Sequence, residues 1–178
     1  MKKFCIILSV SLVIIVGFIS LIFIRFPKKY MSTIEKYAVE NNLPIYMVAS
    51  VINIESGFNE MSLSHAGAMG LMQLKLSTAS DMAKILGVKV DKVNIYDTEL
   101  NIMLGTKYLA YLLEMFDGNE TNALVAYNWG LQNVKDWIMN GNVTDTGTIT
   151  NIPVRETRNY LKKYRLNRFV YKNLYGKE

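Results

Sequence analysis

The chain has 178 residues, a formal net charge of +5, one cysteine and one histidine. A single cysteine excludes an intrachain disulfide, and the sequence offers no cluster of metal ligands, so we expect no metal cofactor. Leu, Ile, Val, Met and Tyr are abundant enough along the chain to form a folded core.

The first segment of the chain is strongly apolar. From Phe4 to Ile24 no residue is charged, and a helix of about 21 residues would be roughly 31 Å long, close to the thickness of a bilayer core. No small-residue cleavage site occurs near Phe26, which favours an uncleaved signal anchor over a cleaved signal peptide. Cys5 lies within this run, where a buried thiol is favoured over palmitoylation. Basic residues flank both sides of the run and leave its orientation open.

The remaining residues, from about Tyr30, are enough for one domain and read as helix in nearly every segment. A capping box at residues 32–35 and an N-cap at Asp97 mark two helix starts, and Gly87 and Gly118 mark two ends. The expected helices span about residues 32–39, 44–56, 77–86, 98–115, 121–129, 132–140 and 154–175. No alternating strand pair is evident, although residues 88–93 could form a short extended piece. The polar segment 142–151 is either a functional loop or a solvated connector.

These patterns predict an all-α domain over residues 30–178, preceded by a membrane anchor and short linker over residues 1–29. A buried soluble helix at the N-terminus is a less favoured alternative. No internal repeat is present.

One predicted helix ends its apolar face in a carboxylate. Val48, Ile52 and Glu55 lie four and three residues apart and share that face. Burial would raise the pKa of the carboxyl group, and a Glu with a pKa of about 6.5 is protonated roughly a quarter of the time at pH 7. Such a group can donate a proton and later accept one. From the helical pattern alone, a Glu55 that reaches solvent at the helix end and caps a neighbour is the favoured alternative.

Segment 65–74, HAGAMGLMQL, sets small residues among larger apolar ones and includes the polar Gln73. Glycines allow close approach of the backbone to another surface. A buried amide needs hydrogen-bond partners, which could be groups of a bound sugar or the backbone of a tight helix contact.

Together, these segments resemble the catalytic domain of lytic transglycosylases, which is related to goose-type lysozyme. The resemblance covers most of the chain after Tyr30, in the order and spacing of the family, and implies a lysozyme-like helical fold. It rests on Glu55-Ser56, Gly70-Leu71-Met72-Gln73, Ala126-Tyr127-Asn128 and the segments 101–109 and 152–160.

The resemblance implies cleavage of the β-1,4 bond between N-acetylmuramic acid and N-acetylglucosamine in peptidoglycan, without a cofactor. Glu55 would protonate the glycosidic oxygen, and the 2-acetamido group of the substrate would stabilise the oxocarbenium-like centre. Glu55 would then remove the proton of the muramic C6 hydroxyl, which attacks C1 to give a 1,6-anhydro end. The absence of a second acid in a comparable apolar setting agrees with this scheme. A hydrolytic muramidase and an inactive wall-binding scaffold are the alternatives.

The resemblance also implies a set of substrate-binding residues beside the catalytic Glu55. Lys75-Leu76 depart from the family, which often has a proline here, and Trp129 stands where a small residue is common. Trp129 could narrow or extend the sugar groove or be a core indole, and His65 could lie near the substrate or be an ordinary loop residue. The implied substrate-binding residues are Ser64, Met72, Gln73, Tyr127, Asn128, Glu156 and Tyr160.

The implied partners are peptidoglycan glycan strands and, through the N-terminal helix, the cell membrane, with a single span and the domain on the extracytoplasmic side. General wall turnover, or the opening of the wall for a secretion or conjugation apparatus, would fit this setting. The basic residues of the last helix could meet anionic wall polymers or lipid headgroups, although a solvated helix face is favoured. Nothing further supports nucleic-acid binding.

Overall fold

The computed structural model describes residues 2–176, with side chains from Ser9 onward, and within that range the regular structure is helical. Isolated bridges occur in two loops, but no strand is formed by the described residues. The elements are α1 (Lys2–Arg25), α2 (Met31–Glu40), α3 (Ile45–Glu55), α4 (Leu76–Leu86), the short 3-10 helix η1 (Asn94–Tyr96), α5 (Thr98–Met115), α6 (Glu120–Trp129), α7 (Leu131–Met139) and α8 (Arg155–Tyr175).

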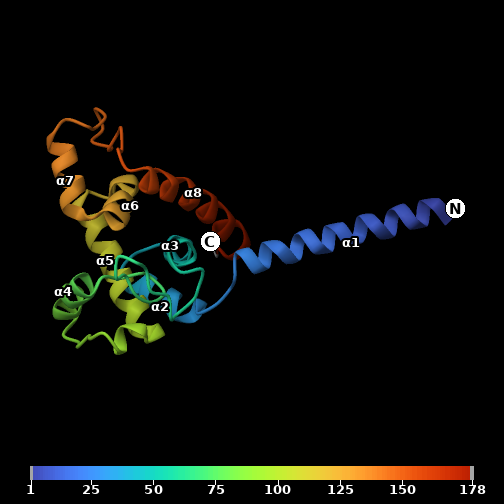
Figure 1. Cartoon of the computed structure of the whole chain (residues 1–178), viewed down its shortest axis with the longest axis horizontal. Coiled ribbons are helices and arrows are strands. Elements are labelled where there is room, and N and C mark those ends of the chain that lie inside the picture. Colours follow the sequence, from blue (N-terminus) through green and yellow to red (C-terminus); the bar gives the residue numbers. More distant parts are fainter. Residues whose placement is uncertain (1, 177–178) are drawn as a thin grey trace.

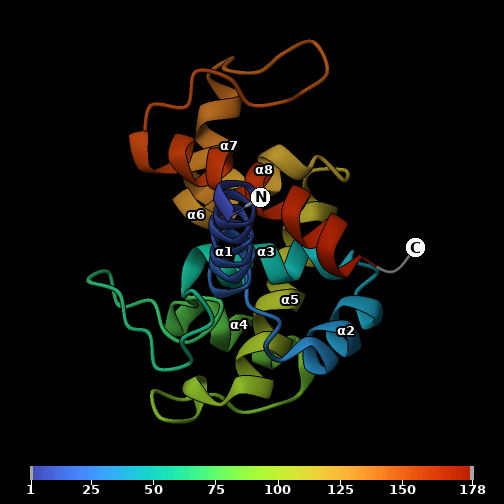
Figure 2. The same ribbon diagram turned by 90° about the vertical axis from the view of Figure 1, so that its right-hand side faces the viewer.

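Helix α3 lies inside the domain and packs against α2 and α8 (Figures 1 and 2). Helix α5 contacts α2, α4 and α6, and α6 also contacts α7 and α8. The apolar face of α3 is fully buried, since Val48 and Ile52 are 0% exposed. Glu55, at the end of this face, therefore lies on the interior side of α3, as the helical spacing predicts.

Most predicted helices are confirmed to within two or three residues at each end. Asp97 caps α5, accepting a hydrogen bond from the backbone N–H of Leu100 at 2.8 Å, and Gly87 ends α4 with a φ of 68°. The capping box predicted at residues 32–35 is wrong. Helix α2 begins at Met31, and its N-cap Tyr30 has a φ of 55° and makes no side-chain cap. Residues 88–93, which could at most have formed a short extended piece, contain no strand.

Helix α1 projects away from the rest of the molecule (Figure 1). Large apolar side chains along it are exposed, including Leu12, Ile15 and Phe18. Among the residues whose side chains are described, no helix is both long and apolar enough to cross a membrane. The predicted transmembrane helix is therefore not confirmed, and residues 4–8 of the predicted span, including Cys5, lie outside the described side chains.

The chain between α1 and α2 is bonded directly to the domain. The backbone carbonyls of Phe26 and Pro27 accept hydrogen bonds from the hydroxyls of Tyr175 and Tyr171, at 2.9 and 3.2 Å. The Phe26 ring is 7% exposed and packs edge-on against Tyr171. The Asn53 amide of α3 donates to the carbonyl oxygen of Arg25 at 3.1 Å. These contacts fix the base of α1 to α3 and α8.

Segment 142–151 is a loop held by its neighbours. Asn122 of α6 donates to the carbonyl of Gly147 and accepts from the backbone N–H of Ile149, at 2.9 and 2.8 Å. The Trp137 indole N–H donates to the carbonyl of Thr150 at 2.9 Å. These hydrogen bonds are to α6 and α7, which agrees with a connector between α7 and α8.

Candidate active site

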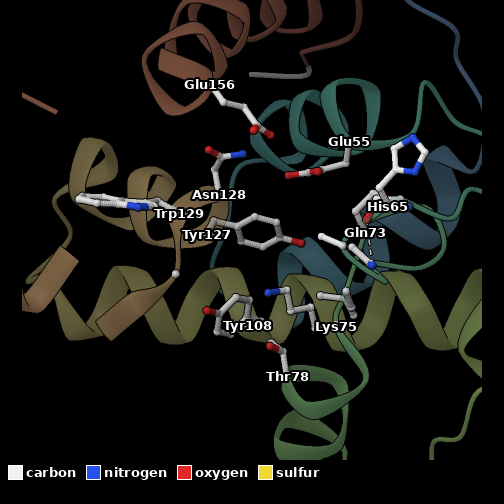
Figure 3. Close-up of a pocket in the computed structure, with 15 residues that line it drawn as sticks. Glu55, His65, Gln73, Lys75, Thr78, Tyr108, Tyr127, Asn128, Trp129 and Glu156 are labelled. Carbon is white, nitrogen blue, oxygen red and sulfur yellow. Dashed lines mark hydrogen bonds between the residues drawn. The ribbon is translucent and has the colours of Figure 1, made fainter. Parts of the chain in front are cut away.

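A pocket of about 550 Å³ opens beside Glu55, between the end of α3, the loop that precedes α4, and helices α5 and α6. The carboxylate lies on one wall, the ring of Tyr127 crosses the middle of the pocket, and Tyr108, Lys75 and Thr78 lie on the opposite side (Figure 3). The pocket is lined by Glu55, Ser64, His65, Ala66, Ala68, Gln73, Leu74, Lys75, Thr78, Tyr108, Tyr127, Asn128, Trp129, Gly130 and Glu156.

Glu55 is the last residue of α3 and is half-buried. Burial raises the pKa of its carboxyl group from 4.5 to about 7, mainly because the charged form loses hydration. The Tyr160 hydroxyl and the Lys163 ammonium lower this pKa, whereas the Glu156 carboxylate raises it. Near neutral pH the group is therefore divided between its protonated and charged forms, which suits a residue that donates and then accepts a proton.

Tyr160, on the first turns of α8, lies near the carboxyl group of Glu55. It is 5% exposed, and its hydroxyl has no partner that meets hydrogen-bond geometry among the described residues. The hydroxyl nevertheless lies close enough to Glu55 to stabilise its charged form, and burial together with the Glu55 charge raises the pKa of Tyr160 well above 10. The Tyr160 hydroxyl therefore stays protonated and can donate a hydrogen bond to Glu55 when its carboxylate is charged.

Tyr127 has a fixed orientation. Its hydroxyl donates to the carbonyl oxygen of Met72 at 2.8 Å, and its ring packs against that of Tyr108, with centroids 5.4 Å apart. Burial, followed by the charge of Glu55, raises its pKa well above 10. The ring is thus held in place as a flat apolar surface beside the acid, a surface on which a sugar face can pack.

The loop before α4 folds back on itself to form the wall around Gln73. The Gln73 amide donates to the carbonyl oxygens of Ser62 and Gly70, at 3.0 and 2.9 Å, and its backbone has a φ of 48°. The Ser64 hydroxyl accepts from the backbone N–H of Ala68 at 2.9 Å. The amide N–H groups of Gln73 are therefore used by backbone acceptors, while its carbonyl oxygen is left for a ligand.

Two close approaches hold this loop against α5. A Cβ added to Gly70 would lie 2.2 Å from the Asn101 amide nitrogen, and one added to Gly105 would lie 2.4 Å from the Met72 sulfur. Asn101 donates to the carbonyls of Met69 and Ile95 and accepts from the backbone N–H of Met72. The glycines thus allow α5 to fix the carbonyl that positions Tyr127.

The structure brings most of the predicted site residues to one pocket. Met72 and Tyr160 do not line it, and both side chains are buried. Their predicted contacts with substrate remain predictions, and the structure gives each a supporting position instead. The predicted residues that line the pocket are Glu55, Ser64, Gln73, Tyr127, Asn128 and Glu156.

Sequence reasoning assigned no role to Lys75 or Thr78, and it left His65 and Trp129 undecided. All four line the pocket. Trp129 also stacks edge-on with Trp137, with centroids 6.1 Å apart, so its indole is part of both a packed cluster and the groove wall. The sequence shows only that Lys75 follows the apolar Leu74. Whether the Lys75 side chain points into the pocket depends on how the loop folds.

Within the described residues, no group of three His, Cys, Asp or Glu side chains is placed to hold a metal ion. The pocket offers a carboxyl group with a pKa near neutrality, aromatic surfaces and amide or hydroxyl groups. This arrangement can bind a sugar chain and transfer a proton to and from one of its oxygens.

Comparison with known proteins gives a family match. The model of the transglycosylase SLT domain matches residues 32–149. Soluble lytic murein transglycosylase from Escherichia coli strain K12 is 32% identical over 142 residues, which are 78% of this chain and 22% of that protein. Membrane-bound lytic murein transglycosylase C from Sodalis glossinidius is 30% identical over 158 residues, covering 76% of this chain and 44% of the relative. The chain thus matches less than half the length of either relative.

Solved structures resemble the domain closely. The 70-kDa soluble lytic transglycosylase in complex with bulgecin A superposes with a TM-score of 0.80 at 30% identity, covering 88% of this chain and 26% of the other. An inactive glutamate-to-glutamine variant of lytic transglycosylase Slt from Pseudomonas aeruginosa gives a TM-score of 0.78 at 28% identity, over 88% of this chain and 26% of the other.

Proposed function

Because the chain belongs to the transglycosylase SLT domain family, we propose that it is a lytic transglycosylase that cleaves the bond between N-acetylmuramic acid and N-acetylglucosamine in peptidoglycan. The products would be strands with 1,6-anhydro-muramic ends. The observation that carries this proposal is a half-buried Glu55, with a pKa of about 7, that lines a pocket walled by aromatic and amide side chains.

Glu55 acts twice in the proposed reaction. In its protonated form it donates to the glycosidic oxygen as the bond to C1 breaks, and the 2-acetamido group of the substrate stabilises the positive centre. The resulting carboxylate then takes the proton of the muramic C6 hydroxyl, whose oxygen forms the new bond to C1. A pKa near neutrality serves both steps, because neither the acid nor the base form is costly to reach.

The surrounding residues support these two steps. The carbonyl of Gln73, the amide of Asn128 and the ring of Tyr127 face the same space as Glu55 and would orient the sugars. The Tyr160 hydroxyl would stabilise the carboxylate that forms after the first step, since its effect is to lower the pKa of Glu55. Water would have to be excluded while the C6 hydroxyl attacks, and the packed Tyr108–Tyr127 pair would cover one side of the pocket.

The test is digestion of purified peptidoglycan followed by mass spectrometry of the soluble products. We expect anhydro ends, which are lighter than reducing ends by the mass of one water. We expect Glu55→Gln to lower the rate at least about 10²-fold, because a neutral amide can neither donate nor accept the proton. Lys89→Met, at an exposed position outside the pocket, is the matched control and should keep the wild-type rate.

The two alternatives give different results in the same assay. A hydrolytic muramidase would release reducing ends and would still require Glu55. A wall-binding scaffold would sediment with insoluble peptidoglycan and release no soluble products. Glu55→Gln would then change neither the sedimentation nor the amount of soluble product.

For location, we propose that α1 attaches the domain to the cell membrane with the catalytic groove on the extracytoplasmic side. Its support is the row of exposed apolar side chains on a helix that projects from the domain, and relatives carry both soluble and membrane-bound names. Residues 1–29 would form the anchor and linker, and residues 30–178 the catalytic domain. Sedimentation with membranes after carbonate washing, lost when residues 1–25 are deleted, is the expected result. Recovery in the soluble fraction would contradict the anchor.

A further inference from the structure

We propose that Lys75 forms a carboxylate-binding subsite in the groove, on the side opposite Glu55, and thereby selects glycan strands that carry acidic groups over neutral ones. The inference rests on the proposed function, because it assigns the acidic substituent of a peptidoglycan strand to one wall of the same pocket. The ligand class is an alkyl carboxylate attached to an amino-sugar chain.

The position of Lys75 is fixed by the backbone on both sides. Leu74 is 2% exposed, and it exchanges two backbone hydrogen bonds with Met69, each 3.0 Å long. On the other side, the Lys75 carbonyl accepts from the backbone N–H of Ala79 at 2.9 Å, in the first turn of α4. The Cα of Lys75 therefore belongs to a rigid corner, and only its side chain is free to adjust.

The side chain extends along the groove instead of away from it. In Figure 3 the side chain of Lys75 runs toward Tyr108, with Thr78 on the same side of the pocket and Glu55 across it. The four methylene groups of the Lys75 side chain can pack against the pocket wall while the ammonium group stays accessible to solvent and ligand.

Charge distinguishes Lys75 from the other residues of the pocket. It is the lining residue with a permanent positive charge, and no described side chain pairs with it in a hydrogen bond or ion pair. The acidic side chains of the pocket, Glu55 and Glu156, lie on the opposite wall (Figure 3). The groove is therefore divided, with negative groups on the proton-transfer side and a free cation on the other.

A neutral sugar chain has no negative group to pair with the Lys75 ammonium group, whereas a peptidoglycan strand carries carboxylates. N-acetylmuramic acid carries a lactyl carboxyl group on O3. Where the stem peptide has been removed, this group is a free carboxylate. Where the peptide is present, the lactyl group is an amide and the carboxylates belong to the peptide. An ammonium group pairs with either source through the same charge-assisted hydrogen bond.

The division of charge also selects a binding direction. An acidic substituent near the Glu156 carboxylate would be repelled, whereas the same substituent near Lys75 would be attracted. Lys75 would thus help to decide which way a muramic residue enters the groove, and repulsion from the opposite wall would sharpen the choice.

The test measures binding separately from catalysis. In the Glu55→Gln background, which keeps the ligand intact, calorimetry would compare Lys75→Met with the matched surface control Lys89→Met. The ligands would be a peptide-free GlcNAc-MurNAc tetrasaccharide, the same tetrasaccharide with stem peptides, and neutral chitotetraose.

We expect Lys75→Met to weaken binding of an acidic ligand about fivefold at low salt and to leave chitotetraose unchanged, since an exposed ion pair contributes on that scale. Lys75→Arg should restore the affinity. A loss confined to the peptide-free ligand identifies the lactyl carboxylate, and a loss confined to the peptide-bearing ligand identifies the stem peptide. Equal affinities for all variants, or an equal loss for chitotetraose, would overturn the subsite.

This outcome is distinguishable from failure of the proposed function. If wild-type protein releases anhydro products but Lys75→Met binds acidic ligands normally, only the subsite is wrong. If wild-type protein releases no anhydro product, the proposed reaction is wrong whatever the binding measurements give.

Discussion

The carboxyl group of Glu55 couples the proposed chemistry to the stability of the fold. In the unfolded chain it titrates near 4.5, and in the folded protein near 7. Between these values the folded state binds more protons than the unfolded state, so this group makes the protein less stable as pH rises from about 4.5 to about 7. Below and above that window its contribution is constant.

Glu55→Gln removes this dependence, because the amide has the same shape and no charge. We expect the variant to be more stable than wild type at pH 8 by about 1–3 kcal/mol and to show no such advantage at pH 4.5. Urea unfolding of both proteins at the two pH values measures the difference. An advantage of equal size at both would mean that the charge of Glu55 is not the cause.

The same pKa predicts a pH profile for activity. Only the protonated form of Glu55 can begin the proposed reaction, so initial rates of peptidoglycan lysis should be level below pH 7 and fall about tenfold per pH unit well above it. Because the Glu156 carboxylate raises the pKa of Glu55, Glu156→Gln should move the fall to lower pH. A wild-type rate unchanged up to pH 9 would exclude Glu55 as the proton donor.

At the scale of elements, the site depends on how closely α5 meets the loop that carries Met72. The added methyl group of Gly105→Ala would overlap the Met72 Cβ and sulfur, at 2.7 and 2.4 Å. We expect a loss of about 1–3 kcal/mol in the free energy of unfolding, as for other overpacked cores. Activity should fall too, because the Met72 carbonyl holds the Tyr127 hydroxyl.

Gly17→Ala is the matched control for this change. Gly17 is also helical, and nothing lies within 4 Å of an added Cβ, so its replacement should cost no stability. If both variants unfold at the same urea concentration as wild type, the close approach at Gly105 does not limit the fold.

The helices were predictable from the sequence because their signals are local. The 3.6-residue period of apolar residues and the Asp97 cap act within one turn, and both are confirmed. The capping box predicted at residues 32–35 is not formed, because α2 already starts at Met31 and Ser32 lies inside its first turn. Tyr30 is held by a hydrogen bond to the Glu60 carboxylate at 3.0 Å, and the helix starts directly after it.

The residues of the candidate site were predictable to different degrees. The spacing of Glu55 from Val48 and Ile52 places it on the buried face of one helix, but its predicted role, like those of Gln73 and Tyr127, came from the family resemblance. A position for Lys75 in the pocket could not be predicted, because the direction of its side chain depends on a loop that Asn101 holds at Met72, 29 residues away. Contacts between residues so far apart in the sequence produce no periodic pattern from which they could be predicted.

At the scale of the whole molecule, α3 and α8 are joined by a buried amide pair. The Asn53 amide donates to the Asn167 side-chain oxygen at 2.6 Å, across 114 residues of sequence. Removing this partner in Asn167→Ala leaves a buried donor with one fewer acceptor, so we expect a loss of about 1–3 kcal/mol in the free energy of unfolding.

Asn173→Ala provides the comparison on the same helix, since Asn173 is exposed and bonds only to the backbone carbonyl one turn before it. Its effect should be within about 0.5 kcal/mol of zero by the same urea measurement. Similar losses for the two variants would show that helix propensity, and not the amide pair, determines the result.

The junction at Phe26 and Pro27 has a consequence for how the enzyme could be used. Three hydrogen bonds tie the chain to α3 and α8 within two residues of the end of α1, which limits rotation of the domain relative to α1. Whatever holds α1 therefore also fixes the direction in which the groove opens and its distance from the point of attachment. Under the proposed function, glycan strands at other depths in the wall would have to move to the groove before they could be cleaved.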